Sequence, residues 1–172
     1  MIKSIYKIVI YFLVFVTLQV LILHNIYLFK IATPLLYLYI IVKVPTNMTR
    51  SQLIFISFIL GIVIDIFYNT LGMHAAACTL AGMFRAPLMH SFTDKELSEG
   101  ATPSYRTLGT RGFIKYVFFL VVIHHVALFL IESISLFDPL FLIFRIFACV
   151  MLTVLFIFIV EAFNRERKDG ES

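Results

Sequence analysis

Three ionisable side chains inside apolar runs are the residues of this sequence best able to do chemistry: Asp65, His74 and Arg145. Asp65 is the only fixed charge between Arg50 and Arg85, and Arg145 interrupts another long apolar run. A carboxylate at bilayer depth costs about 2.5–3.5 kcal/mol, so it must face protein or trapped water and find a partner. These residues therefore predict an intramembrane polar cluster.

The cluster has two interpretations. It could be a binding pocket or a coupling site for a proton or a substrate, or it could be a buried ion pair between Asp65 and Arg145 that fixes helix packing. We favour the ion pair, because one acid with one base is what the burial of charge already requires. Glu132 and Asp138 are expected at the outer surface, where they would be solvated or would face a partner.

Adjacent histidines at positions 124 and 125 suggest a metal site, but the signal is weak. Neighbouring residues on a helix point about 100° apart, so only one of the two rings can face the bundle core well. Hydrogen bonding is favoured over metal ligation for both. The sequence also has no phosphate-binding glycine loop, no His-Glu-x-x-His helix and no nucleophile with its base. We therefore predict no enzyme activity, no cofactor and no metal.

The composition excludes a soluble globule. Of 172 residues, 61% are hydrophobic and only 14% are charged, and the mean hydropathy is +0.99, so too little polar surface exists to cover a fold in water. A membrane-spanning helix needs about 20 apolar residues. We predict an all-α, polytopic membrane protein with a single domain (1–163), a charged cytoplasmic tail (164–172) and six spans, at about 5–23, 31–44, 51–67, 71–89, 112–133 and 139–160.

The second of these spans is short. Lys30 and Lys43 bracket it, and Pro34 lies in its first turn, where a missing N–H does no harm. Both lysines could extend outward along their aliphatic stems and lengthen the span. A thin span is therefore favoured over a re-entrant hairpin.

Small residues predict close packing of the third and fourth spans. Ser57, Gly61 and Asp65 recur every four residues and so share one helix face, which a neighbouring helix can approach closely. The fourth span is rich in small residues, among them Gly72 and Gly82. It is expected to lie centrally, with neighbours on several sides.

The basic residues predict the orientation. Of the 14 Lys and Arg residues, all except Lys30 and Arg145 fall on the side of the membrane that holds both termini and residues 91–111. Cytoplasmic loops carry the excess of Lys and Arg, so this side is expected to be cytoplasmic.

The pattern of motifs also resembles a known family. An early proline in the second span (Pro34), Gly61 four residues before Asp65, and Gly72 opening a helix of small residues resemble MreD, a family of bacterial rod shape-determining membrane proteins. The resemblance is most specific over residues 58–82. It implies a non-enzymatic, multi-pass scaffold of the bacterial inner membrane, surrounded by lipid and without nucleic acid. Its partner would be a bitopic MreC-like protein, linked indirectly to the MreB filament, RodA and a penicillin-binding transpeptidase.

A second resemblance gives the alternative. The six-span architecture is similar to that of the substrate-binding subunits of vitamin transporters, which implies a small-molecule binding function. Such a subunit needs a sizeable cavity with several convergent polar groups. The short outer loops, with only Asp65, His74 and Arg145 converging, favour the scaffold.

Overall fold

The chain is all-helical over the residues that the computed structural model describes, which are 2–23, 32–93, 97–98, 100–133 and 138–169. The helices within these ranges are α1 (Ile2–Leu21), α2 (Leu38–Lys43), α3 (Arg50–Tyr68), α4 (Met73–Ser91), α5 (Tyr105–Glu132) and α6 (Pro139–Asp169). Their boundaries are close to those of the predicted spans, except in α2, α5 and α6.

Three of the helices in the described ranges are long and apolar enough to cross a membrane. They are α3, α5 and the Pro139–Asn164 part of α6. The apolar part of α1, Ile8–Leu21, is shorter. These lengths and compositions indicate a membrane protein.

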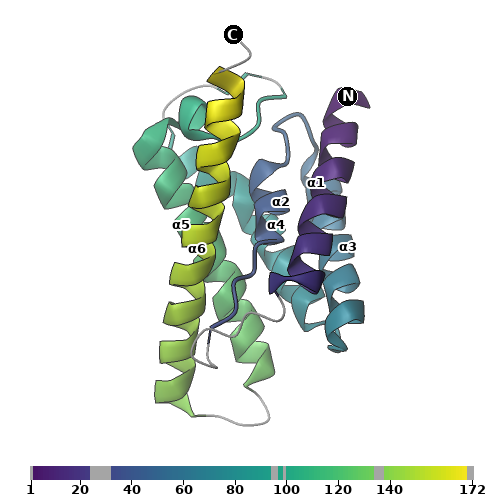
Figure 1. Cartoon of the computed structure of the whole chain (residues 1–172), viewed down its shortest axis with the longest axis vertical. Helices are drawn as coiled ribbons and strands as arrows, with labels where there is room; N and C mark the ends of the chain where they lie inside the picture. The colour runs from purple at the N-terminus through teal and green to yellow at the C-terminus, as the bar shows by residue number, and fades with distance from the viewer. Residues whose placement is uncertain (1, 24–31, 94–96, 99, 134–137, 170–172) are drawn as a thin grey trace.

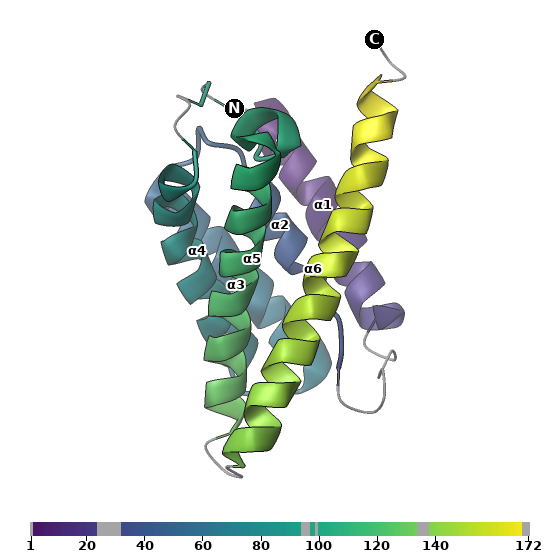
Figure 2. The same ribbon diagram turned by 90° about the vertical axis from the view of Figure 1, so that its left-hand side faces the viewer.

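The helices run side by side along one long axis, as Figures 1 and 2 show. The first turns of α1 and the last turns of α6 lie at the same end of the bundle, together with the connection from α4 to α5 (Figure 1). We call this the near end. The opposite end, which we call the far end, holds the turn at residues 68–72, the end of α5 and the start of α6. The short α2 lies between the other helices in both views.

The second predicted span, at residues 31–44, is not one continuous helix. The chain is non-helical at residues 33–35, makes a turn at 36–37 and is α-helical only over the six residues of α2. Every residue of α2 is buried, and Lys43 is only 3% exposed. The expectation that Lys43 extends outward is therefore wrong, because its side chain is enclosed by protein.

The pair α3 and α4 makes the most extensive contact between helices in the described ranges. A capping box between Thr49 and Gln52 starts α3, and Asn69 ends it in the left-handed conformation at φ 54°. At Gly61 an added Cβ would lie 2.3 Å from the Cα of Ala75, and at Gly82 it would lie 2.5 Å from the Ser57 hydroxyl. The two helices can lie this close because neither glycine has a side chain.

Gly72 has a different role from the one the sequence suggested. A Cβ at this position would meet no atom within 4 Å, so Gly72 does not lie at a close helix contact. Its φ is +78°, a value that residues with a side chain rarely adopt. Gly72 therefore allows the sharp turn that leads into α4.

Two helices extend beyond the predicted spans. A capping box between Ser104 and Thr107 starts α5 at Tyr105, before the predicted start at 112, and Gly109 breaks the helical geometry one turn later at φ 71°. At the C-terminus, α6 continues to Asp169, so residues 164–169 prolong this helix.

The contact at Gly61 gives the first prediction. Replacement of Gly61 by Ala should destabilise the protein by about 1–3 kcal/mol, because the new methyl group would meet backbone atoms that cannot move away. Gly82→Ala should cost less, because the added methyl group would meet the side chain of Ser57 rather than backbone, and a rotamer change of the hydroxyl with a small shift of the Ser57 Cβ relieves the contact. Unfolding in detergent measures both. The control is Ala76→Leu, at an exposed position of α4, and equal losses in all three variants would contradict this account.

Candidate functional site

The carboxylate of Asp65 caps the N-terminus of α4. Its two oxygens accept hydrogen bonds from the backbone N–H of His74 at 3.0 Å, from that of Ala75 at 2.9 Å and from the Thr70 hydroxyl. The cap position itself is Gly72, which has no side chain to do this. A negative charge is also favourable at the positive end of a helix. Asp65 thus finds its partners in backbone N–H groups.

Arg145 has a different partner from the one predicted. Its guanidinium donates to the carboxylate of Glu132 at 3.0 Å and lies 4.5 Å from the centre of the Phe129 ring. The predicted ion pair between Asp65 and Arg145 is therefore wrong. Glu132, whose side chain is 39% exposed, is partly solvated and also pairs with Arg145. Arg145 pairs with the last residue of the preceding helix because α5 and α6 are neighbours at the far end.

The structure does bring His74 close to Asp65, and it adds residues that the sequence did not connect with them. The Tyr37 hydroxyl lies 2.7 Å from Nδ1 of His74 and 3.1 Å from Nε2 of His124. A hydroxyl has one proton to donate, so Tyr37 donates to one ring and accepts from the other. Cys78 lies 3.7 Å from the same nitrogen of His124. This buried group joins α2 to α4 and α5.

The non-helical chain before α2 takes its hydrogen bonds from two distant helices. From α1, the buried amide of Gln19 donates to the Pro34 carbonyl at 3.0 Å and accepts from the Leu36 N–H at 2.7 Å. From α6, the Thr153 hydroxyl accepts from the Leu35 N–H at 3.0 Å. Non-helical backbone is tolerated at membrane depth only where protein or trapped water satisfies it. Gln19 and Thr153 meet that requirement.

His125 supports Thr153 through a hydrogen bond. Its Nδ1 lies 2.9 Å from the Val121 carbonyl, which can only accept, so Nδ1 carries the proton. Nε2 then accepts from the Thr153 hydroxyl at 3.2 Å. Among the residues that the structure describes, no group of three or more His, Cys, Asp or Glu side chains could hold a metal ion.

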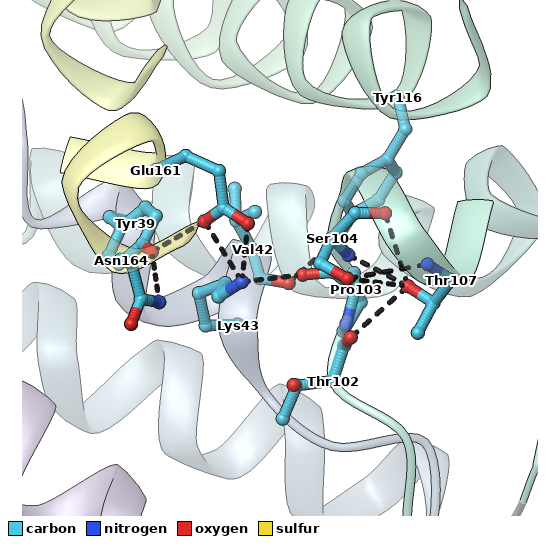
Figure 3. Close-up of polar contacts among 10 residues, drawn as sticks. All are labelled: Tyr39, Val42, Lys43, Thr102, Pro103, Ser104, Thr107, Tyr116, Glu161 and Asn164. Atoms are coloured by element: carbon cyan, nitrogen blue, oxygen red, sulfur yellow. Dashed lines mark hydrogen bonds and ion pairs between the residues drawn. The ribbon is translucent and has the colours of Figure 1, made fainter. Parts of the chain in front are cut away.

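A buried ion pair lies at the near end, between Lys43 of α2 and Glu161 of α6 (Figure 3). The Lys43 ammonium lies 2.9 Å from the carboxylate of Glu161 and donates to the Pro103 carbonyl at 2.8 Å. The Tyr39 hydroxyl donates to Glu161 at 2.6 Å, and the Asn164 amide donates to Tyr39 at 3.3 Å. We call these residues the Lys43–Glu161 cluster. It joins α2, α6 and the segment before α5.

Two more side chains satisfy the C-terminal end of α2. The Tyr116 hydroxyl donates to the Val42 carbonyl at 3.2 Å, and Arg85 donates to the Val44 carbonyl. Carbonyl groups at the end of a helix have no partner within it. Both ends of α2 are thus held by side chains of other helices.

Sequence reasoning missed Gln19, Tyr37, Glu161 and the role of Lys43. A signal for the ion pair was present, because Lys43 and Glu161 both end apolar spans on the same predicted side of the membrane. Gln19 and Tyr37 gave a weaker signal, since single uncharged polar residues are common in spans.

Two hollows lie on the surface of the described structure. At the far end a cavity of about 220 Å³ is lined by polar and apolar side chains, among them Tyr68, His74, Glu132 and Arg145. We call it the far-end cavity. Between α1 and α3 lies a wholly apolar groove of about 230 Å³, lined by Ile8, Val9, Phe12, Leu13, Phe55, Ile56 and Ile59. We call it the α1–α3 groove.

Comparison with known proteins gives no relative: the chain matches no model of a protein family, no curated protein and no solved structure. The inferences about function are therefore based on the sequence pattern and on the contacts described above.

The Lys43–Glu161 cluster gives the second prediction. Lys43→Met should destabilise the protein by about 3–5 kcal/mol, because it leaves the Glu161 carboxylate buried without its counter-charge. The double variant Lys43→Met/Glu161→Leu should recover most of that loss, since no charge is then buried. Unfolding in detergent and the amount of protein in the membrane measure the effect. Lys115→Met, which removes an exposed lysine, is the control; losses that simply add would disprove the pairing.

The cap at Asp65 gives the third prediction. Asp65→Asn should cost about 0.5–2 kcal/mol, because one acceptor oxygen remains for the N-terminus of α4. Asp65→Leu should cost more, because it removes both acceptors. Adding Arg145→Leu should not rescue Asp65→Leu, since the two residues are not paired, and the two losses should add. If the double variant is instead more stable than Asp65→Leu alone, Asp65 and Arg145 are paired after all.

Proposed function

We propose that this protein is a non-enzymatic scaffold of the bacterial cell-elongation complex, related to the MreD family. It would bind a bitopic MreC-like protein in the inner membrane and so connect, indirectly, the MreB filament with peptidoglycan synthesis by RodA and a penicillin-binding transpeptidase. The basis is the motif pattern around Gly61, Asp65 and Gly72, together with the way the described polar side chains are used.

These polar side chains serve the fold. Asp65 caps α4, Gln19 and Thr153 satisfy the chain before α2, and the Lys43–Glu161 pair fixes α2 against α6. Each holds backbone or another buried charge in place. An arrangement of this kind makes a rigid bundle, and a rigid bundle suits a protein whose task is to position a partner.

The structural observation that supports binding of a partner helix is the α1–α3 groove. Its lining is entirely apolar and includes exposed side chains such as Leu13 and Phe55, so the groove would be open toward the membrane. Helices associate within a membrane through shape and van der Waals packing. Lipid tails can cover any smooth apolar surface. A groove between two helices instead favours a third helix, whose row of side chains can pack into it. We therefore place the membrane-spanning helix of the partner in this groove.

The proposed topology has six spans and both termini in the cytoplasm. The near end, where α1 starts and α6 ends (Figure 1), would face the cytoplasm because most basic residues of the sequence lie there. The second span would consist of residues 32–37 followed by α2. The far end, and with it the far-end cavity, would face outward.

The alternative function is that of a small-molecule binding subunit of a transporter, similar to the vitamin-binding subunits. The far-end cavity is the observation in its favour, because polar groups converge on it. Its volume of about 220 Å³ is below the range of about 300–1,000 Å³ that is usual for ligand pockets. This difference favours the scaffold.

The topology gives the fourth prediction. Cysteines introduced at Ser98 and Ser172 should be protected from a membrane-impermeant thiol reagent in intact cells, whereas a cysteine at Ser135 should be labelled. The reason is the excess of basic residues on the side of both termini. Permeabilised cells provide the control, because all three positions should then react. Labelling at Ser98 in intact cells would reverse the proposed orientation.

The function itself gives the fifth prediction. Affinity purification of the full chain from its native membranes in a mild detergent should capture a single-span protein with a coiled coil. Ile59→Trp, which fills the α1–α3 groove, should reduce that capture about tenfold or more, because a loss of about 1.4 kcal/mol in binding free energy already weakens the affinity tenfold. Phe147→Trp is the matched control, because Phe147 is exposed on α6, away from the groove.

Three outcomes would count against the proposal. Capture of a pair of ATPases in place of the single-span protein would favour the transporter subunit. Equal capture by the Ile59→Trp and Phe147→Trp variants would show that the partner does not bind in the groove. Capture of neither kind of protein by the parent chain would remove the case for a scaffold.

A further inference from the structure

The far-end cavity lies where four parts of the chain meet: the segment before α2, the turn between α3 and α4 with the start of α4, the end of α5, and the second and third turns of α6. Its wall combines apolar side chains, such as Leu128 and Met73, with the polar side chains of Tyr68, Thr70, His74, Glu132 and Arg145. The volume is about 220 Å³. A space of this size suits a small polar group rather than a drug-sized molecule.

The two charged residues of the cavity are only partly engaged with each other. The side chains of Arg145 and Glu132 are 33% and 39% exposed, and one N–H of the guanidinium donates to Oε1 of Glu132 at 3.0 Å. A guanidinium has five N–H donors and a carboxylate has about four acceptor positions. The Phe129 ring, 4.5 Å from the guanidinium carbon, holds the plane of Arg145 in place. Donors and acceptors therefore remain for a ligand.

In the proposed topology the pair would lie at the outer end of the bundle, close to the level of lipid head groups. Glu132 is the last residue of α5, and Arg145 lies six residues after Pro139, the first residue of α6. Six residues of α-helix correspond to about 9 Å. The polar zone on each side of the hydrocarbon core is about 5–8 Å thick. A head group entering from this side of the membrane could reach both charges.

The charges on the wall select the chemistry of the ligand. A simple anion on Arg145 would be repelled by the Glu132 carboxylate beside it, and a simple cation on Glu132 would be repelled by the guanidinium. A ligand that carries an anion and a cation a few bonds apart satisfies both. The cation must also have N–H groups, because a carboxylate accepts hydrogen bonds and a fully methylated ammonium has none to donate.

We propose that the far-end cavity binds a phosphoethanolamine group, with its phosphate on Arg145 and its ammonium on Glu132. The group could come from a phosphatidylethanolamine lipid of the adjacent leaflet or from free phosphoethanolamine in solution. The assignment rests on the cavity alone, so it stands or falls independently of the scaffold function.

The test uses the purified full-length chain in two arms. In the first, the protein in a neutral detergent is titrated with phosphoethanolamine, phosphocholine and inorganic phosphate. In the second, it is placed in nanodiscs of equimolar phosphatidylethanolamine and phosphatidylcholine. Native mass spectrometry then measures which lipid stays bound to the protein after the protein is released from the nanodisc. We expect a preference of about tenfold or more for the ethanolamine compound over the choline compound, as the loss of charge-assisted hydrogen bonds implies. A preference for phosphoethanolamine in the titration indicates that the ligand is the free compound. A preference for ethanolamine that appears only in nanodiscs indicates that the ligand is the lipid.

Variants then separate binding from folding. Glu132→Gln should reduce the preference for ethanolamine over choline, because the hydrogen bonds from the ammonium are then no longer charge-assisted, while Arg145→Gln should weaken binding of both compounds about tenfold or more. Lys115→Gln, which removes an exposed charge outside the cavity, should bind like the parent. A structural role of the ion pair alone would change thermal stability without changing the head-group preference.

The parent protein can overturn the proposal without any variant. Equal retention of the two lipids together with no binding in the titration would do so. Inorganic phosphate bound as tightly as phosphoethanolamine would show a simple anion site, and phosphocholine bound equally well would show that Glu132 makes no hydrogen bond to the ligand.

Discussion

Backbone N–H and C=O groups that lie outside a helix in an apolar interior must find hydrogen-bond partners. This constraint is strongest between Thr33 and Val44. There the chain is helical for only six residues, and hydrocarbon offers no hydrogen bonds to the remainder. Side chains of α1, α4, α5 and α6 supply them, through Gln19, Arg85, Tyr116 and Thr153. The other helices are arranged around this short segment, and the buried side chains of Gln19, Arg85 and Thr153 are placed where its backbone needs them.

The sequence predicted the helical class and most helix boundaries, because long apolar runs separated by turn residues have few alternatives. It also identified Asp65 correctly as a residue that needs a partner. The identity of that partner was wrong, because we looked for an opposite charge when the nearest unsatisfied groups were the N–H groups of His74 and Ala75, within ten residues along the chain. Helix N-termini are a local solution to a buried carboxylate.

Long-range partners were harder to predict. The pair of Lys43 and Glu161 is separated by 118 residues, and no periodicity within one helix indicates such a contact. Lys43 was interpreted as a lysine at the membrane surface, since that is the usual position of a lysine at the end of a span. The break before α2 was also missed, because Pro34 is as compatible with the first turn of a helix as with a non-helical chain. Hydropathy reports the environment of a segment and not its backbone conformation.

The separation between these partners affects how the protein is made. The chain emerges from the ribosome in order, so the segment before α2 enters the membrane long before Thr153 of α6, its partner 118 residues later, has been synthesised. The α3–α4 hairpin, by contrast, contains its own cap at Asp65 and can form as soon as both of its helices have been synthesised. Until α6 arrives, the Leu35 N–H would lack the Thr153 hydroxyl to which it donates in the folded chain, and water, the translocation machinery or a membrane chaperone would have to satisfy it. The segment before α2 therefore depends on the C-terminal helix for its final structure.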